Sequence, residues 1–102
     1  MCHFLLIFFS LVRRMEKTLT DVEQFVVDFV LKIRTEKKLT QEDLGFILGV
    51  DRSFINKIEN LEHNAKYNLN HINRLADHWG ISPQEFLPKK AFPVSQNEES
   101  QK

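Results

Sequence analysis

Apolar residues recur at three- and four-residue intervals between residues 22 and 33, which is the period of an α-helix with one buried face. The residues on this face are Val22, Phe25, Val26, Phe29, Val30 and Ile33. Thr20 and Glu23 stand ahead of it at the spacing of a capping box, and Lys37 and Lys38 suit a helix C-terminus. We therefore predict a first helix from about residue 21 to residue 36 or 37.

The next apolar positions divide into two short helices around a tight turn. Thr40 can cap a helix from Gln41 to about Leu48, and Gly49 can end it because glycine adopts the left-handed conformation at little cost. Asp51 can cap a second helix that continues to about Glu59. The apolar side of the pair consists of Leu44, Leu48, Val50, Ile55 and Ile58. Because so short a connection fixes the crossing angle, the second helix could enter the DNA major groove.

The remaining pattern predicts a polar loop over residues 61–70 and two further helices. A helix from His71 to Trp79 would turn Ile72, Leu75, Ala76 and Trp79 inward, and Gly80 would stop it. Ser82, Pro83 and Glu85 open a short last helix, whose Phe86 and Leu87 would close the core. We expect an all-α domain of about five short helices over residues 18–88, followed by a disordered polar tail over residues 89–102.

These residues resemble the phage-repressor (Cro-like, xenobiotic-response-element) helix-turn-helix family over roughly residues 25–88. The matching positions are Arg34, Leu39, Thr40, Gln41, Leu44, Leu48, Gly49, Val50, Ile55, Ile58, Glu59, Ile81, Ser82 and Leu87. The resemblance implies a compact lambda-repressor-like bundle and a transcriptional regulator that binds double-stranded operator DNA. It also implies a homodimer on a two-fold symmetric operator, because one such domain contacts too few base pairs.

The resemblance also implies roles for individual residues. It gives Arg52, Ser53 and Lys57 as base-reading candidates, to which we add Asn56 one turn on, and Gln41 as a phosphate candidate. Asn60 and Lys66 are weaker phosphate candidates, chosen from their position after the second helix. Arg52 is the strongest on physical grounds, because a guanidinium can bridge guanine O6 and N7. Lys57 as a solvated lysine and Ser53 as a local backbone acceptor are the plainer alternatives. Arg34 and Glu59 would form an ion pair that supports the second helix.

Three positions depart from the family pattern. Gly45 replaces the usual alanine where the two helices approach closely, so we predict that Gly45→Ala is neutral or stabilising and that Gly45→Leu disrupts the fold. Leu61 replaces the usual glycine after Asn60, which leaves the end of the second helix open. Phe54 stands where the family is commonly polar, and it could contact a thymine methyl, support a dimer or cover the core.

Composition limits the alternatives. The 102 residues carry 14 Lys and Arg against 14 Asp and Glu, which is less basic than a typical DNA-binding protein. A protein-interaction module without DNA binding is therefore the alternative function. Cys2 is the only cysteine, and the four histidines, at positions 3, 63, 71 and 78, lack metal-ligand spacing. We expect no enzyme activity, no metal, no cofactor and no small-molecule ligand, and a cytoplasmic location.

Residues 1–17 form a hydrophobic N-terminal extension with an apolar run from Phe4 to Val12. The run is too short for a membrane span and lacks the preceding positive charge of a secretory signal. It could be a tether, which would make the protein a membrane-tethered regulator, or a segment that packs on the domain. We favour a third reading, in which Met15 is the true start and the chain then carries 12 basic and 14 acidic residues. The family includes phage or mobile-element repressors, restriction controllers and antitoxins, and a toxin partner could bind at the tail or near Phe54.

Overall fold

The computed structural model describes residues 19–94, so the N-terminal extension lies outside the described residues. Within that range the chain is all-α, as predicted, with four α-helices and two short turns of 3-10 helix rather than five similar helices. The elements are α2 (Asp21–Glu36), α3 (Gln41–Leu48), α4 (Arg52–Glu59), η1 (Glu62–Asn64), α5 (Leu69–Trp79) and η2 (Pro83–Phe86). In residues 19–94, no helix has the length and apolar content needed to cross a bilayer.

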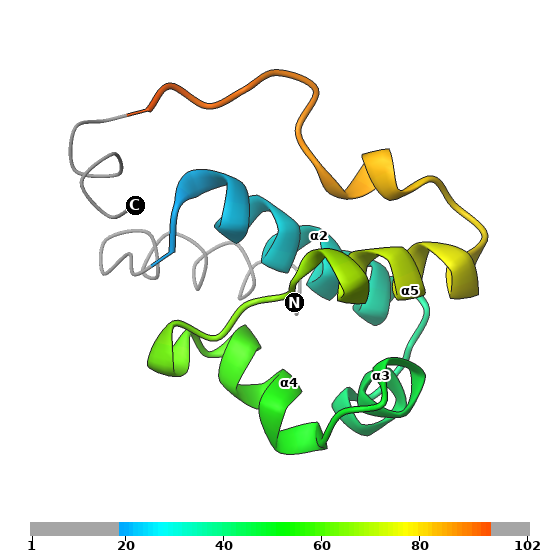
Figure 1. Ribbon diagram of the computed structural model, residues 1–102. Helices are drawn as coiled ribbons and strands as arrows, with labels where there is room; N and C mark the ends of the chain where they lie inside the picture. The colour runs from blue at the N-terminus through cyan, green and yellow to red at the C-terminus, as the bar shows by residue number, and fades with distance from the viewer. Residues whose placement is uncertain (1–18, 95–102) are drawn as a thin grey trace.

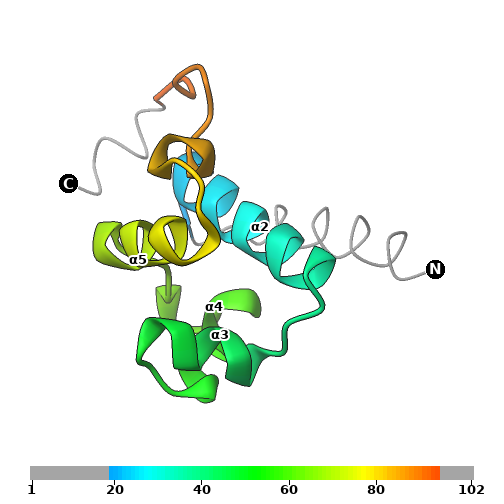
Figure 2. The same cartoon turned by 90° about the vertical axis from the view of Figure 1, so that its right-hand side faces the viewer.

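The helices form two layers, with α3 and α4 together on one side and α2 and α5 on the other (Figures 1 and 2). The core lies between these layers. Its fully buried side chains are Val27, Val30, Leu44, Ile55, Ile58, Leu75 and Phe86. Because α4 contributes two of these residues to the core, its opposite side is left at the surface of the domain.

The buried face of α2 is rotated from the predicted one. Val27 is 1 % exposed although the periodicity did not include it, whereas Val22 is 40 % exposed. Helix α2 contacts both α4 and η2, and the Phe86 ring of η2 lies 4.9 Å from the ring of Phe29. A shift of about one residue turns a helical face by about 100°. The predicted stripe was therefore correct in period and for Val26, Phe29 and Val30, but it included the exposed Val22 and missed the buried Val27.

The predicted boundaries of the first two helices, α2 and α3, are confirmed by their caps. The Thr20 hydroxyl accepts the Glu23 N–H (3.3 Å) and the Glu23 carboxylate accepts the Thr20 N–H (3.1 Å). Thr40 and Asp43 form a second capping box, with distances of 3.0 and 2.9 Å. Gly49 ends α3 in the left-handed region, with φ of 71°. These local hydrogen bonds satisfy N–H groups that the first turn of a helix cannot pair by itself.

The residue that follows the C-cap of α4 adopts the left-handed backbone conformation although it is not glycine. Asp51 is the N-cap residue, as predicted, but its side chain makes no capping hydrogen bond. At the other end Asn60 is the C-cap, and Leu61 takes φ of 57°. A left-handed leucine costs about 1–2 kcal/mol. Leu61 offsets this cost by packing its side chain, half-buried, against the core.

The predictions for residues 61–87 need three corrections. The loop contains η1 and buries Tyr67, and α5 begins at Leu69 rather than His71. The earlier start follows from a capping box in which the Asn68 side chain accepts the His71 N–H (2.8 Å) and the His71 ring accepts the Asn68 N–H (3.1 Å). The last helix is one 3-10 turn, and Leu87 remains 42 % exposed while Phe86 alone enters the core.

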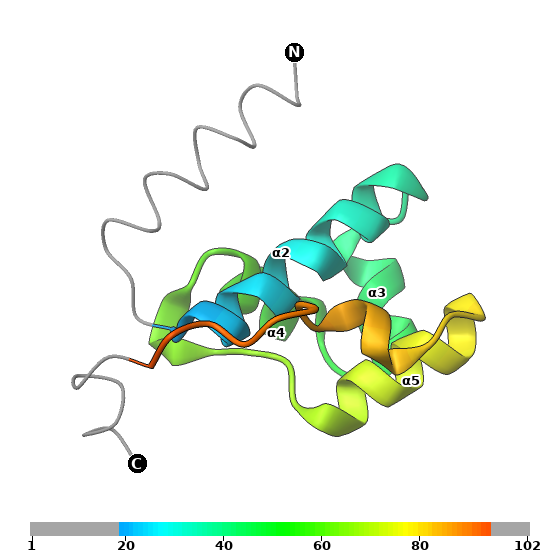
Figure 3. The same ribbon diagram turned by 90° about the horizontal axis from the view of Figure 1, so that it is seen from above.

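The chain after η2 runs back along α2 (Figure 3). The Phe92 ring meets the Phe25 ring edge-on, with centroids 6.3 Å apart. This contact covers part of the α2 surface that the rotated helix leaves outside the core. Residues 95–102, the end of the tail predicted to be disordered, lie outside the described residues.

Candidate nucleic-acid interface

The outer side of α4 carries three of the predicted base-reading residues. Arg52, Ser53 and Lys57 are exposed, whereas Ile55 and Ile58 on the opposite side are fully buried. With about 100° between successive residues, this division places Ser53 and Lys57 away from the core. A short helix that presents a hydroxyl, an ammonium and a guanidinium in this way has the donors needed for base edges and phosphates.

A bidentate ion pair links the end of α4 to α2. The Arg34 guanidinium donates through Nε to Glu59 Oε2 (2.8 Å) and through Nη2 to Glu59 Oε1 (3.0 Å). Its Nη1 also donates to the backbone oxygen of Leu39 (2.7 Å). The side chains are 15 % and 9 % exposed. The pair expected from the resemblance is therefore present, and it ties α4 and the segment before α3 to one arginine.

A row of amide side chains continues from that ion pair. Gln41 Nε2 donates to Glu59 Oε1 (2.8 Å), and Gln41 Oε1 accepts from Asn56 Nδ2 (3.2 Å). Asn56 Oδ1 in turn accepts from Asn60 Nδ2 (3.1 Å). Asn56, a predicted base reader, thus lies half-buried against Gln41 instead of beside Ser53 and Lys57. Gln41 and Asn60, two of the predicted phosphate ligands, belong to the same row.

A hollow of about 670 Å³ adjoins the N-terminus of α3 and is lined by the cationic side chains of Arg34, Lys38 and Arg52. The N–H groups of a first helical turn and the positive end of the helix dipole favour an anion at such a place. Glu42 lines the same hollow and opposes this attraction. The hollow is therefore a candidate site for a phosphate group.

The comparison with known families agrees with this geometry. Residues 30–86, more than half of the chain, match the helix-turn-helix family model. The chain belongs to the Cro-like, xenobiotic-response-element helix-turn-helix family. Curated proteins and solved structures yield no significant match. Membership of this family identifies the chain as a DNA-binding helix-turn-helix regulator.

The close approach within the helix-turn-helix argues against our prediction for Gly45→Ala. A Cβ atom placed on Gly45 would lie 2.7 Å from the backbone oxygen of Val50 and 3.5 Å from the backbone nitrogen of Arg52. The Val50 N–H donates to the Gly45 oxygen (2.9 Å), so the turn is already held against α3. The expectation of a neutral or stabilising change rests on helix propensity only. The geometry favours a loss instead, because the methyl group would collide with the backbone of the turn.

Lys66, the third predicted phosphate ligand, is engaged at the start of α2. Its ammonium contacts the Glu23 carboxylate at 2.7 Å, with side chains 47 % and 30 % exposed. Burial alone would raise the pKa of Glu23, but the hydrogen bonds from Lys66 and from the Thr20 backbone outweigh burial and lower it. The structure thus separates Lys66 from the amide row that joins Gln41 and Asn60.

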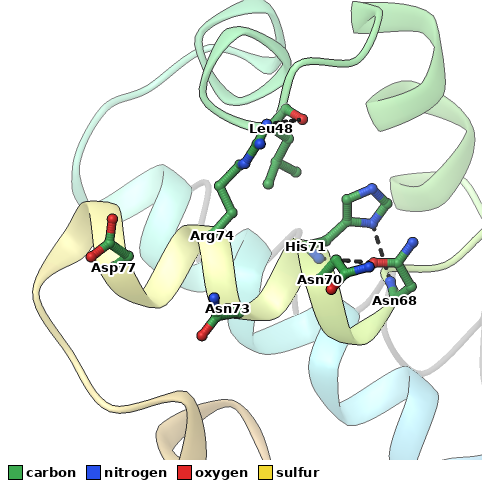
Figure 4. Close-up of a pocket in the computed structure, with 7 residues that line it drawn as sticks. All are labelled: Leu48, Asn68, Asn70, His71, Asn73, Arg74 and Asp77. Carbon is green, nitrogen blue, oxygen red and sulfur yellow. Dashed lines mark hydrogen bonds between the residues drawn. The ribbon is translucent and has the colours of Figure 1, made fainter.

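Two contacts that sequence reasoning missed hold the helix-turn-helix against α5. Arg74 Nη1 donates to the backbone oxygen of Leu48 (3.1 Å) across a polar hollow of about 670 Å³ (Figure 4). The Phe54 ring lies 5.7 Å from the ring of His71 and packs, half-buried, against the core. Of the three roles considered for Phe54, core cover is the one for which the structure provides contacts. Neither pair had a signal in the sequence, because each joins residues far apart along the chain.

Proposed function

We propose that this protein is a sequence-specific transcriptional repressor that binds a two-fold symmetric operator as a homodimer. The observation that carries the proposal is the exposure of Arg52, Ser53 and Lys57 on one side of a helix anchored by Arg34 and Glu59. A helix held at a fixed angle can present the same side chains to the same base pairs at each encounter. Two copies about one DNA turn apart would supply the specificity that one domain lacks.

Within this proposal the individual residues have different roles in binding DNA. Arg52 reads a guanine through its paired N–H groups, while Ser53 and Lys57 contact neighbouring base edges or phosphates. Gln41 and Asn60 bind the DNA backbone beside α4, and Lys66 has at most a minor part because Glu23 holds it. The regulated genes could be those of a phage, a mobile element, a restriction system or a toxin pair.

The test is retardation of the DNA upstream of the protein's own gene, with unrelated DNA as competitor. We expect binding that resists the competitor and is lost in Arg52→Ala. Asn73→Ala, which changes an exposed residue of α5, is the matched control and should bind as the unchanged protein does. Equal sensitivity of the specific and unrelated complexes to competitor would contradict sequence-specific recognition.

A protein-interaction function is the second candidate, and one observation favours it. Phe46 on α3 is 89 % exposed, the largest exposure among the large apolar side chains of the described residues. An apolar ring in water at this position suits a protein partner better than a phosphate backbone. Under this alternative, Phe46→Ser would abolish partner binding and Arg52→Ala would leave it unchanged, which is the reverse of the pattern expected for DNA.

A further inference from the structure

The row of amides beside α4 has a fixed direction. A carboxylate can only accept hydrogen bonds, so Gln41 must turn its Nε2 toward Glu59 and its Oε1 away. That oxygen accepts from Asn56, which must therefore present Nδ2 to Gln41 and Oδ1 to Asn60. The orientation of each amide follows from the one before it, and the Glu59 carboxylate determines the first.

Arg34 fixes the orientation of the Glu59 carboxylate, at which the row begins. Its two N–H groups bind both carboxylate oxygens, at 2.8 and 3.0 Å, and fix the plane of the carboxylate. Gln41 and Asn56 are half-buried and Asn60 is exposed, so the row leads from the ion pair outward to the surface. The outer end of the row is Asn60, the C-cap residue of α4.

The amides of the row keep N–H groups that the row itself does not use. Each amide nitrogen carries two N–H groups, and each of Gln41, Asn56 and Asn60 uses one of them within the row. The second N–H of each amide remains for an acceptor outside the row. Phosphate oxygens of DNA are acceptors only, so they match these donors. The amide oxygens of Gln41 and Asn56 already accept hydrogen bonds within the row.

The same bonds conflict with base reading by Asn56. Recognition of adenine by asparagine uses the amide oxygen and nitrogen together, toward N6 and N7. In this protein the Asn56 oxygen is taken by Asn60 and its nitrogen by Gln41. Reading a base would therefore have to use the one N–H and the one lone pair of Asn56 that remain, in an orientation already set by Gln41 and Asn60.

We propose that Asn56 is a positioning residue that orients Gln41 and Asn60 as amide donors to the DNA backbone, in a direction set by Glu59. The proposal rests on the DNA-binding function proposed above and deepens it. It moves Asn56 from sequence reading to backbone binding, and it makes the affinity contributions of Gln41 and Asn56 interdependent.

The first test needs no DNA. The unfolding free energies of Gln41→Ala, Asn56→Ala and the double variant form a cycle, and we expect Asn56→Ala to cost clearly less when Gln41 is already alanine. Asn56→Ala combined with Asn73→Ala is the control pair, and its two effects should add. Additive effects for Gln41 and Asn56 would overturn the row itself, whatever the protein binds.

The second test uses two duplexes of equal length, one selected by the unchanged protein from a random-sequence pool and one with that sequence scrambled. We expect Asn56→Ala to weaken binding to both by the same factor, about tenfold, and to leave the ratio of their Kd values unchanged. Arg52→Ala should instead change that ratio. The double variant Gln41→Ala, Asn56→Ala should bind about as weakly as the weaker single variant.

The outcomes separate the possible failures. Relaxed selection at one base pair in Asn56→Ala would show that Asn56 reads a base and would overturn the proposal. Multiplying losses in the double variant would overturn the coupling. If the unchanged protein binds neither duplex, the proposed function fails and the donor role fails with it, while the DNA-free cycle still decides whether the row exists in solution.

Discussion

Gly45→Ala tests the packing of the helix-turn-helix most directly. The added methyl carbon would lie 2.7 Å from the Val50 oxygen, whereas ordinary contacts begin near 3.4 Å, so α3 and the turn must separate by several tenths of an ångström. Alanine gains about 1 kcal/mol of helix propensity over glycine, while overpacking of a rigid site costs about 1–3 kcal/mol. We expect a net loss of roughly 1 kcal/mol and weaker DNA binding, because the angle of α4 changes.

Urea denaturation measures this loss, and the neighbouring Phe46 provides a matched control. Phe46 is 89 % exposed in the same helix, so the difference between Phe46→Ala and Phe46→Gly gives the propensity of alanine over glycine without a steric term. Gly45→Leu should lose the fold altogether. If Gly45→Ala gains as much stability as the Phe46 pair indicates, the close approach does not constrain the protein and the steric argument is refuted.

Three further substitutions test the supports of the interface. Lys38 holds φ of 59°, so Lys38→Gly should raise the unfolding free energy by about 0.5–1 kcal/mol, whereas Lys37→Gly, at φ of −85°, should lower it in the same urea titration. Arg34→Ala should cost about 2–4 kcal/mol because it leaves the largely buried Glu59 without its guanidinium, and Arg34→Lys should recover only part of this in thermal unfolding. Burial, and then the charge of Arg74, lower the pKa of His71 below its usual value. The unfolded chain therefore binds the proton more readily, so stability should be full above about pH 6.5 and fall as the pH drops from there toward the folded pKa. His71→Gln should remove that slope and His78→Gln should retain it; an unchanged slope in His71→Gln would assign the titration elsewhere.

The helix boundaries could be predicted because they are determined locally. A threonine cap and an acidic residue three positions later close a ring within one turn, as at Thr20 and Thr40. Gly49 ends α3 through its own backbone freedom. The box of Asn68 and His71 obeys the same rule but has histidine where glutamate is usual, which is why the start of α5 was placed two residues late.

The details of the site depend instead on contacts between distant segments. The resemblance suggested the pair of Arg34 and Glu59, but no spacing rule brings Asn56 to Gln41 or Arg74 to the end of α3. The expectation for Gly45 omitted the steric term for the same reason, because helix propensity is a property of one residue and the collision involves the turn five residues later. Periodicity likewise gives the width of the buried face of α2, while its centre is set by α4 and η2.

The amide row explains how a chain with no net charge can bind DNA. A lysine or arginine at a phosphate releases counterions, and each such contact adds about 0.9 to the slope of log affinity against log salt. Lys66 is paired with Glu23 and Arg34 with Glu59, which leaves Lys38, Arg52 and Lys57 as the exposed cations of the hollow and of α4 in the described residues. Amide donors bind phosphate oxygens without releasing counterions, so a slope no steeper than about −2.7 per protomer, or about −5.4 for the proposed homodimer, is expected even for tight binding. A protein that relied on charge alone would need a steeper slope for the same affinity, and titration of the unchanged protein with salt distinguishes the two.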